Sequence, residues 1–360
     1  MKLIAQLLVV GFLAGCGVGT DGTAQLEAVS SGAVGQALNA GHGHGHGHAA
    51  FKVKNVDFYV DLPGIGNHLK VATRVYEPHN GKARSVVQLA LHGATYDGRY
   101  WEIPEINGVS YSYAEDMASR GYIVVVMDQL GAGQSDKPDG DLFGLAEAGS
   151  ALYQVGEQIR QHIGKHRALV YVGHSNGSVT SLWSQGIYGG ADAVITTGWV
   201  HGYRGLPVDP NDPVFQQALS TPYIHLPGEA RQGLFYFPPQ TDPDLIAYDN
   251  ANLNNAMPRH QFLDLIGVHA DITNLGPGGM TTLTKTQLIT VPVLVQAGNQ
   301  DFAIAPASTV NDPPTEAGFF PSSPSVTVQS LDQMGHSFNG HFTHDESWDA
   351  IDAWLTATFP

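Results

Sequence analysis

The sequence predicts an open, doubly wound α/β sheet whose strands are mostly parallel, with a further segment inserted into it. Short, almost wholly apolar runs recur along the chain, which is typical of strands buried on both faces of a parallel sheet. These runs are Val86–Leu91, Tyr122–Met127, Ala168–Val172, Ala193–Thr197 and Val291–Ala297. Helix-like stretches lie between them at Tyr111–Arg120, Leu142–His162 and Gly177–Gln185. Alternation of strands with helices indicates a doubly wound sheet.

The remaining elements follow from the pattern before and after these runs. Phe51–Val60 and Leu69–Tyr76 alternate apolar and polar residues, which predicts two strands that are buried on one face. After the insertion the strand–helix pattern resumes at Val291. It closes with a strand over Ser325–Leu331 and a helix around Trp348–Phe359.

The alternation fails between about Trp199 and Thr290, where Leu-Pro, Asp-Pro and Phe-Pro-Pro breaks occur among scattered aromatic residues. A structureless loop of that length would be unusual inside a compact domain. We therefore predict a cap insertion over residues 199–285. The predicted organisation is a signal peptide at 1–15, a flexible tether at 16–50, and a core formed by 51–198 and 286–360.

Composition limits the classes of function. Of 360 residues, 42% are hydrophobic and 14% are charged, so a sizeable core is feasible. The formal net charge is −16, and an acidic surface repels phosphate backbones, which disfavours nucleic acid as a partner. Cys16 is the single cysteine. An intramolecular disulfide and a thiolate metal cluster within the chain are therefore excluded.

The N-terminus has the pattern of an export signal. Lys2 precedes an apolar run over Leu3–Leu13, which is shorter than the about 20 residues of a membrane span but matches a signal-peptide core. Leu13-Ala14-Gly15-Cys16 resembles the bacterial lipobox, in which the cysteine is lipidated. We expect an exported bacterial lipoprotein of the cell envelope, periplasmic or on the outer surface, attached to the membrane through Cys16. The alternative is an ordinary signal peptide with a chance cysteine.

A second feature of the tether is the alternating tract from Gly41 to His48. In an extended chain, His42, His44, His46 and His48 project to one side, where they could share a metal ion. The alternative is a soluble spacer that binds metals only incidentally. The tract is assigned no catalytic role, and no metal or other cofactor is expected for catalysis.

Gly173-His174-Ser175-Asn176-Gly177 follows an apolar strand and precedes a helix-compatible stretch. This is a G-x-S-x-G pattern in the strand–turn–helix context of a nucleophile elbow. Ser175 must then occupy a strained turn, and the flanking glycines allow strand and helix backbones to pass closely. The helix N-terminus faces the oxyanion that develops during acyl transfer. Ser175 is the candidate nucleophile.

Leu91-His92-Gly93-Ala94 ends an earlier predicted strand, and here the sequence resembles the α/β-hydrolase superfamily. The resemblance implies that the backbone N–H groups of Ala94 and Asn176 form the oxyanion hole. The segment from Asp128 to Pro138 is similar to the D-x-x-G-x-G-x-S-D-x-P segment of capped members, where its role is structural. Asp128 and Asp136 are therefore left out of the catalytic set. The resemblance covers roughly residues 70–360 apart from much of the cap.

In this superfamily the acid and the base follow the serine in that order. Asp301 lies in the loop after the strand Val291–Ala297, where the family carries its acid. The alternative is a solvated loop aspartate. His336, in Met334-Gly335-His336, follows the last predicted strand as the family's Gly-His does. His341 and His344 lie close by and are the alternative bases.

The implied mechanism is acyl transfer through a Ser175, His336 and Asp301 triad, with water hydrolysing the acyl-enzyme. Family members that open epoxides or remove halide carry aspartate in place of the serine. The expected activity is therefore cleavage of a carboxylic ester or lactone of a small-to-medium apolar substrate. The rivals are a serine-dependent C–C bond hydrolase, a cofactor-free perhydrolase, and a non-catalytic surface protein that binds ligand or metal.

Aromatic residues supply candidates for the substrate pocket. They are Tyr96, Trp101, Phe235 and Tyr236. The alternative for each of them is a place in the core, which is the commoner position of such side chains.

Overall fold

The computed structural model describes residues 51–79, 83–163, 167–201, 211, 213–273, 284–303 and 313–360. The predicted signal peptide, the lipidation site at Cys16 and the histidine tract lie outside the described residues, so these remain predictions. Within the described ranges, no helix has both the length and the apolar character that crossing a membrane requires.

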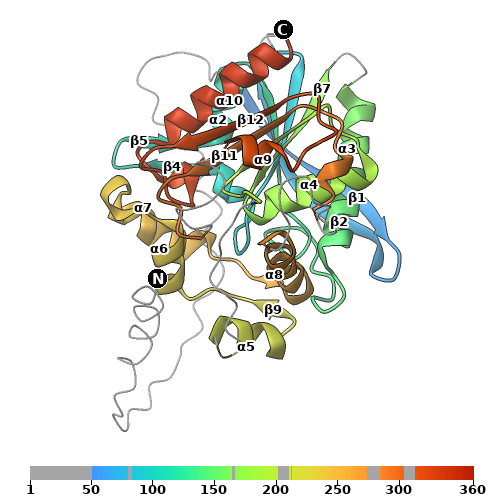
Figure 1. Ribbon diagram of the computed structural model, residues 1–360, viewed down its shortest axis with the longest axis vertical. Coiled ribbons are helices and arrows are strands. Elements are labelled where there is room, and N and C mark those ends of the chain that lie inside the picture. Colours follow the sequence, from blue (N-terminus) through green and yellow to red (C-terminus); the bar gives the residue numbers. More distant parts are fainter. Residues whose placement is uncertain are drawn as a thin grey trace. The chain divides into compact units, whose positions relative to one another are not determined.

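The centre of the fold is an eight-stranded sheet (Figure 1). In spatial order its strands are β1 (Phe51–Leu62), β2 (Gly66–Pro78), β6 (Ile123–Met127), β3 (Val86–Leu91), β7 (Ala168–His174), β8 (Ala193–Thr197), β11 (Val293–Gly298) and β12 (Val326–Leu331). The pairs β1–β2 and β2–β6 are antiparallel, and every other pair is parallel. The predicted fold class, a mostly parallel doubly wound sheet, is confirmed.

The burial of the strands explains their sequence patterns. All residues of β3, β8 and β11 are buried, because helices cover both faces of the sheet. In β1 burial alternates toward its C-terminal end, where Phe58, Val60 and Leu62 are buried between exposed neighbours. A strand with one covered face shows this period of two.

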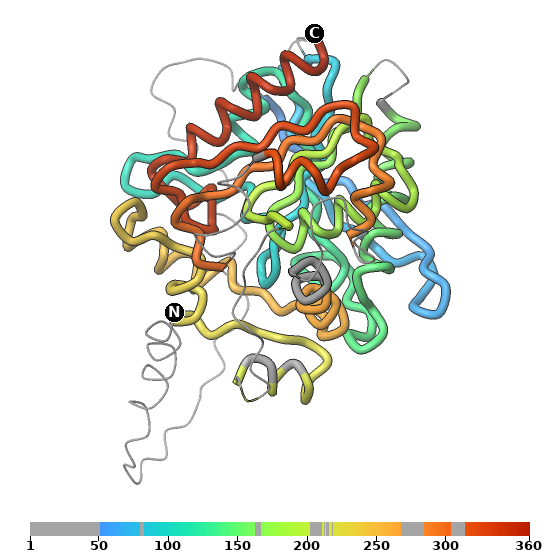
Figure 2. The backbone as a smooth tube through the Cα atoms, viewed as in Figure 1, coloured from blue at the N-terminus to red at the C-terminus, as the bar shows by residue number. Residues whose placement is uncertain are grey.

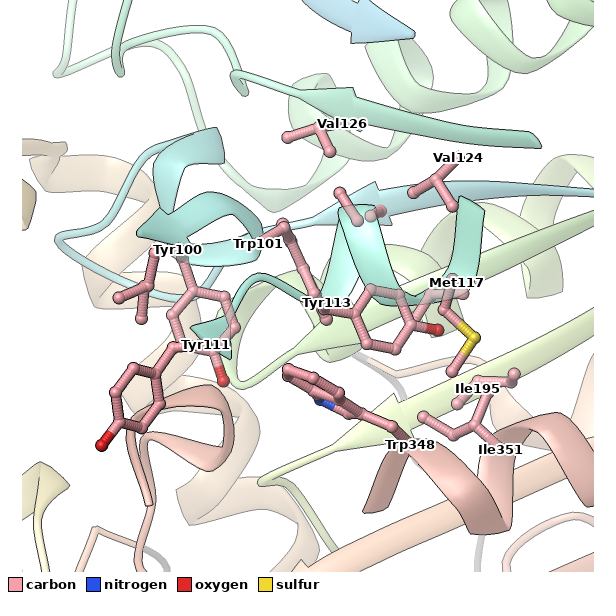
Figure 3. Packing of buried hydrophobic residues seen from close by; sticks show 14 of the residues in the cluster. Tyr100, Trp101, Tyr111, Tyr113, Met117, Val124, Val126, Ile195, Trp348 and Ile351 are labelled. Atoms are coloured by element: carbon pink, nitrogen blue, oxygen red, sulfur yellow. The ribbon is translucent and has the colours of Figure 1, made fainter. Parts of the chain in front are cut away.

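The helices are divided between the two faces. On one face, α2 (Tyr113–Ser119) and α10 (His344–Thr358) pack Met117, Trp348 and Ile351 against Val124 and Val126 of the sheet (Figure 3). Although α2 and α10 are far apart in the sequence, they contact each other (Figure 2). The other face is covered by α3 (Leu145–Ile163) and α4 (Asn176–Tyr188).

A small hairpin before α2 differs from the prediction. β4 (Ile103–Ile106) and β5 (Val109–Tyr111) pair antiparallel around Asn107 and Gly108, whose φ angles are 52° and 80°. Two successive positive φ values are the requirement of a type I′ turn. Tyr111 is therefore in a strand and does not begin a helix. The helix begins at Tyr113, after Ser112, whose side chain accepts a hydrogen bond from the Glu115 N–H.

The segment between β8 and β11 is built from short helices, and its prolines begin several of them. Pro227 is the N-cap of α6 (Gly228–Phe235), and Pro243 opens α7 (Pro243–Tyr248). Proline suits a helix start because its missing N–H would have no partner there. The segment also contains α5 (Pro213–Ser220), β9 (Tyr223–Ile224), 3₁₀-helices at Pro238–Gln240 and Thr286–Leu288, a π-helical turn at Asp249–Leu253, β10 (Met257–Pro258) and α8 (Arg259–Thr273). The bounds of the cap, 199–285, remain a prediction.

Candidate active site

The predicted site residues follow the carboxyl ends of neighbouring parallel strands. Ala94 comes after β3, Ser175 after β7, Asp301 after β11 and His336 after β12. Because the carboxyl ends of parallel strands share one edge of a sheet, the topology brings these four residues to the same edge.

Ser175 occupies a strained turn between β7 and α4. Its φ is 51° and its ψ is −116°, a backbone conformation that non-glycine residues adopt rarely and at a cost of about 1–3 kcal/mol. A Cβ on Gly173 would lie 2.5 Å from the Gly177 carbonyl oxygen, and a Cβ on Gly177 would lie 2.5 Å from the Leu91 carbonyl oxygen. Only glycine therefore permits this close passage of strand and helix. The serine itself remains partly exposed.

Asp301 and His336 form a buried pair. Asp301 Oδ2 lies 2.8 Å from His336 Nδ1, and both residues are almost inaccessible to solvent. Asp301 Oδ1 accepts a further hydrogen bond from the Ala303 N–H at 3.0 Å. A carboxylate at Nδ1 fixes the imidazole tautomer and leaves Nε2 free to take a proton.

The imidazole of His336 lies beside the turn that carries Ser175. Its ring centroid is 5.0 Å from that of His174, and a Cβ on Gly198 would lie 3.4 Å from His336 Cε1. Among the described residues no hydrogen bond joins Ser175 Oγ to His336. Catalytic hydrogen bonds of this kind often form only when substrate is bound.

The two alternative bases have other partners. His341 donates from Nδ1 to the Ser337 carbonyl oxygen at 2.8 Å, and its Nε2 accepts from the N–H groups of Phe237 at 3.0 Å and Gly335 at 3.2 Å. Both ring nitrogens are thus engaged. His344 Nδ1 contacts the His341 carbonyl oxygen, and its Nε2 faces Asp345, a carboxylate on the surface. Of the three histidines, His336 is the one paired with a buried carboxylate.

We expect His341 to make the fold sensitive to acid. Burial, which disfavours the charged ring, lowers the pKa of His341 from 6.5 to about 4. The unfolded chain therefore binds this proton more readily, and stability is lost as the pH falls from 6.5 to about 4, by at most about 3 kcal/mol. Urea midpoints across this pH range should fall less steeply in His341→Gln than in the wild type.

The control for that measurement is His162→Gln, which removes an exposed histidine of α3. It should keep the wild-type slope. A His341→Gln variant whose midpoint depends on pH as the wild type's does would contradict the role given to this histidine.

Ala94 and Asn176, whose N–H groups are the expected oxyanion donors, line one small cavity together. Its volume is about 10 Å³, close to the space that one water molecule needs. The remaining lining is His92, Gly93, Thr95, Tyr96, Gln129, Leu130, Ala132, Ala256, Met257, Pro258 and Gln261. None of these side chains carries a carboxylate, so the cavity is suited to neutral groups.

Arg231, which the sequence analysis did not single out, is hydrogen-bonded to the residue that follows Ala94. Its Nη1 donates to the Thr95 carbonyl oxygen at 3.0 Å and to Thr95 Oγ1 at 2.6 Å, and Thr95 has a φ of 58°. Its Nη2 lies 2.6 Å from Asp249 Oδ1, and both charged side chains are fully buried. The guanidinium also stands 4.4 Å from the centroid of the Tyr96 ring. The hydrogen bonds from Arg231 to Thr95 therefore tie the segment between β8 and β11 to the turn that carries Ala94, and Asp249 holds the guanidinium in place.

The predicted pocket aromatics have different surroundings. Tyr96 lines the cavity and stacks on Phe235, whose ring centroid is 5.2 Å from that of His336. Tyr236 packs beside His341. Trp101 packs against Tyr113 (Figure 3). All four aromatic residues are buried in the same hydrophobic cluster, and their place in a substrate pocket remains a prediction.

Another aromatic residue, Tyr100, was not predicted at the site. Its ring stacks on His174 with centroids 4.4 Å apart.

Within the described ranges, no group of three or more His, Cys, Asp or Glu side chains is arranged so that it could hold a metal ion.

Comparison with known proteins places the chain among hydrolases. A profile of the serine aminopeptidase, S33, family matches residues 105–341. No curated protein sequence matches the chain.

Solved structures share the fold at low identity. Monoglyceride lipase from Saccharomyces cerevisiae is 16% identical, with a TM-score of 0.61 over 85% of this chain and 96% of that chain. Monoacylglycerol lipase from Paleococcus ferrophilus is 17% identical, with a TM-score of 0.56 over 81% and 99%. A thermophilic esterase from Thermogutta terrifontis is 18% identical, with a TM-score of 0.51 over 85% and 100%. At such identities the likeness establishes the fold alone.

Proposed function

We propose, since the chain belongs to the serine aminopeptidase S33 family, that its site cleaves a carboxylic ester or lactone of a small-to-medium apolar substrate. The observation that carries the proposal is the buried contact of 2.8 Å between Asp301 and His336, at the sheet edge where Ser175 occupies its strained turn. A nucleophile turn and an oriented histidine are the parts that acyl transfer needs.

Each residue has a distinct role in the proposed reaction. His336 takes the proton of Ser175 as the serine oxygen attacks the carbonyl carbon. The N–H groups of Ala94 and Asn176 stabilise the oxyanion, and His336 then gives its proton to the leaving alcohol. Asp301 orients the imidazole and stabilises its charged form. Water hydrolyses the acyl-enzyme in the same way, with His336 as the base.

The name of the family makes aminopeptidase activity the second candidate. An aminopeptidase must bind an α-ammonium group, and a carboxylate close to the reacting carbonyl is the natural partner of that charge. The cavity lining contains no acidic side chain. Asp249, a fully buried acid of the neighbouring segment, is already paired with Arg231. These two observations favour a neutral ester, as does the fold shared with two lipases and an esterase.

A substrate panel tests this function. Purified protein should hydrolyse p-nitrophenyl esters of short and medium chain length, and should release p-nitroaniline from alanine p-nitroanilide far more slowly. A diketone in the same panel tests C–C bond hydrolysis. Faster turnover of the anilide or the diketone than of every ester would overturn the proposal.

We also propose that the mature protein is a lipoprotein attached through Cys16, which rests on the sequence pattern alone. In the native host, Cys16→Ser should move the protein from the membrane fraction to the soluble fraction, since the thiol is the lipid acceptor. Two acyl signals hold a protein stably on a membrane, and a protein without them is released. An unmodified Cys16 in the mature native protein, seen by mass spectrometry, would sink this idea.

A further inference from the structure

We infer that Gln129 and Gln261 form a subsite, beside the reacting carbonyl, for a neutral substrate group that both donates and accepts a hydrogen bond, such as a hydroxyl. The inference rests on the proposed ester hydrolysis and narrows its substrate class. Both glutamines line the cavity that Ala94 and Asn176 also line.

Gln129 presents an acceptor. Its Nε2 donates to the His92 carbonyl oxygen at 2.7 Å, and its backbone N–H donates to His92 Nε2 at 3.1 Å. Because the amide nitrogen is engaged, the orientation of the side chain is fixed and Oε1 is its free end. This oxygen is buried and has no hydrogen-bond partner among the described residues.

Gln261 presents a donor. It lies in the first turn of α8, directly after the cavity residues Met257 and Pro258. The side chain is 2% exposed, and its Nε2 has no partner in the described part of the chain. Buried polar atoms are rarely left unpaired, because such an atom has lost its hydrogen bonds to water without gaining others, which costs free energy. An unpaired donor and an unpaired acceptor on one cavity indicate a bound group that serves both.

Size and charge select that group. The cavity of about 10 Å³ has room for one oxygen atom with its proton. A hydroxyl would donate to Gln129 Oε1 and accept from Gln261 Nε2, whereas a methyl group could do neither. An ion would find no charged partner in the lining. A site of this kind discriminates strongly, since an analogue without the hydroxyl leaves both buried groups unpaired.

The test uses two pairs of esters in pH-stat assays. In the first pair, ethyl 2-hydroxybutyrate carries the hydroxyl on the acyl side and is compared with ethyl butyrate. In the second pair, 2-hydroxyethyl butyrate carries it on the alcohol side and is compared with the same ester. In at least one pair, kcat/KM should favour the hydroxyl ester by about tenfold or more, as expected for two hydrogen bonds to neutral groups. Comparison between variants cancels the different intrinsic reactivity of the esters.

Gln261→Met keeps the length and packing of the side chain but removes the donor. In this variant the ratio of kcat/KM for the hydroxyl ester to kcat/KM for the plain ester should fall close to the ratio of their uncatalysed rates. Gln129→Met, which removes the acceptor, is the second variant in case the first does not fold. Gln88→Met is the matched control, because Gln88 is equally buried with an unpartnered Nε2 but does not line the cavity. It should keep the wild-type ratio.

Three results would overturn the inference. They are the absence of a hydroxyl preference in the wild type, a preference that survives both cavity variants, and a Gln88→Met variant that loses the preference equally. If the wild type hydrolyses the plain ester and both hydroxyl esters with equal kcat/KM, Gln129 and Gln261 hold only a water molecule. The proposed function stays intact in that case. Failure to hydrolyse any ester contradicts the proposed function itself.

Discussion

Ser175→Ala is expected to remove esterase activity, with a loss of about 10⁴-fold or more in turnover, as for the nucleophile of other serine triads. The variant loses the attacking oxygen and nothing else. Alanine and serine have the same Cβ and bear the same strain at a φ of 51°, so the melting temperature should change little. Ester turnover and thermal unfolding, measured on the same preparation, check both parts.

Ser184→Ala is the matched control for that variant. Ser184 is a buried serine of α4, the helix that follows Ser175, and its hydroxyl donates to the Gly149 carbonyl oxygen. Its loss should lower stability by roughly 1 kcal/mol, the worth of one hydrogen bond, and should leave turnover near that of the wild type. If Ser175→Ala kept most of its activity, the nucleophile assignment would be wrong.

Asp301→Asn is expected to lower turnover by roughly 10²–10⁴-fold with little change in thermal stability. The amide is nearly isosteric, but it selects the wrong imidazole tautomer and does not stabilise the imidazolium. The contact of 2.8 Å between Asp301 Oδ2 and His336 Nδ1 is the physical reason for the size of the effect.

Asp128→Asn is the control, because Asp128 is another buried acid after a strand. Its carboxylate accepts hydrogen bonds at 2.8 Å from the N–H groups of Gly98 and Gln134, and it lies 3.5 Å from Arg74. These partners hold loops together, so this variant should change folding or expression. An inactive but folded Asp128→Asn beside an active Asp301→Asn would move the acid to the earlier strand.

The sequence was informative where its signals are local. Each of the eight sheet strands coincides with a predicted strand. Strands buried on both faces, such as β3, β8 and β11, have little choice of residue, and β1, which is covered on one face, shows the alternation of such a strand. The turn glycines Gly173 and Gly177 were predicted for the close backbone passage that the structure shows. The order of strands and the two antiparallel pairs were not predicted, because they depend on contacts distant in sequence.

Two local features were misjudged. Asn107-Gly108 is a strong hairpin signal, yet the predicted helix over Tyr111–Arg120 includes Tyr111, which ends β5. The prolines of the insertion are predicted as breaks, although Pro227 caps the start of α6 and Pro243 is the first residue of α7. Those helices span 8 and 6 residues, too few for a helical period to show in the sequence.

Other parts of the site depend on tertiary contacts. Arg231 and Asp249 are 18 positions apart, and charged residues mostly lie on the surface, so nothing in the sequence marks them as a buried pair. Gln129 belongs to the segment that resembles a structural part of the superfamily. Its free oxygen becomes significant only when Gln261 is seen on the same cavity.

Covalent labelling shows directly whether Ser175 is an activated nucleophile. A fluorophosphonate reacts with a serine that a neighbouring base activates, and peptide mass spectrometry then locates the adduct. We expect a single adduct, on the peptide that carries Ser175, which disappears in Ser175→Ala and is much reduced in Asp301→Asn. An adduct on another residue, or a folded wild-type protein that stays unlabelled, would contradict it.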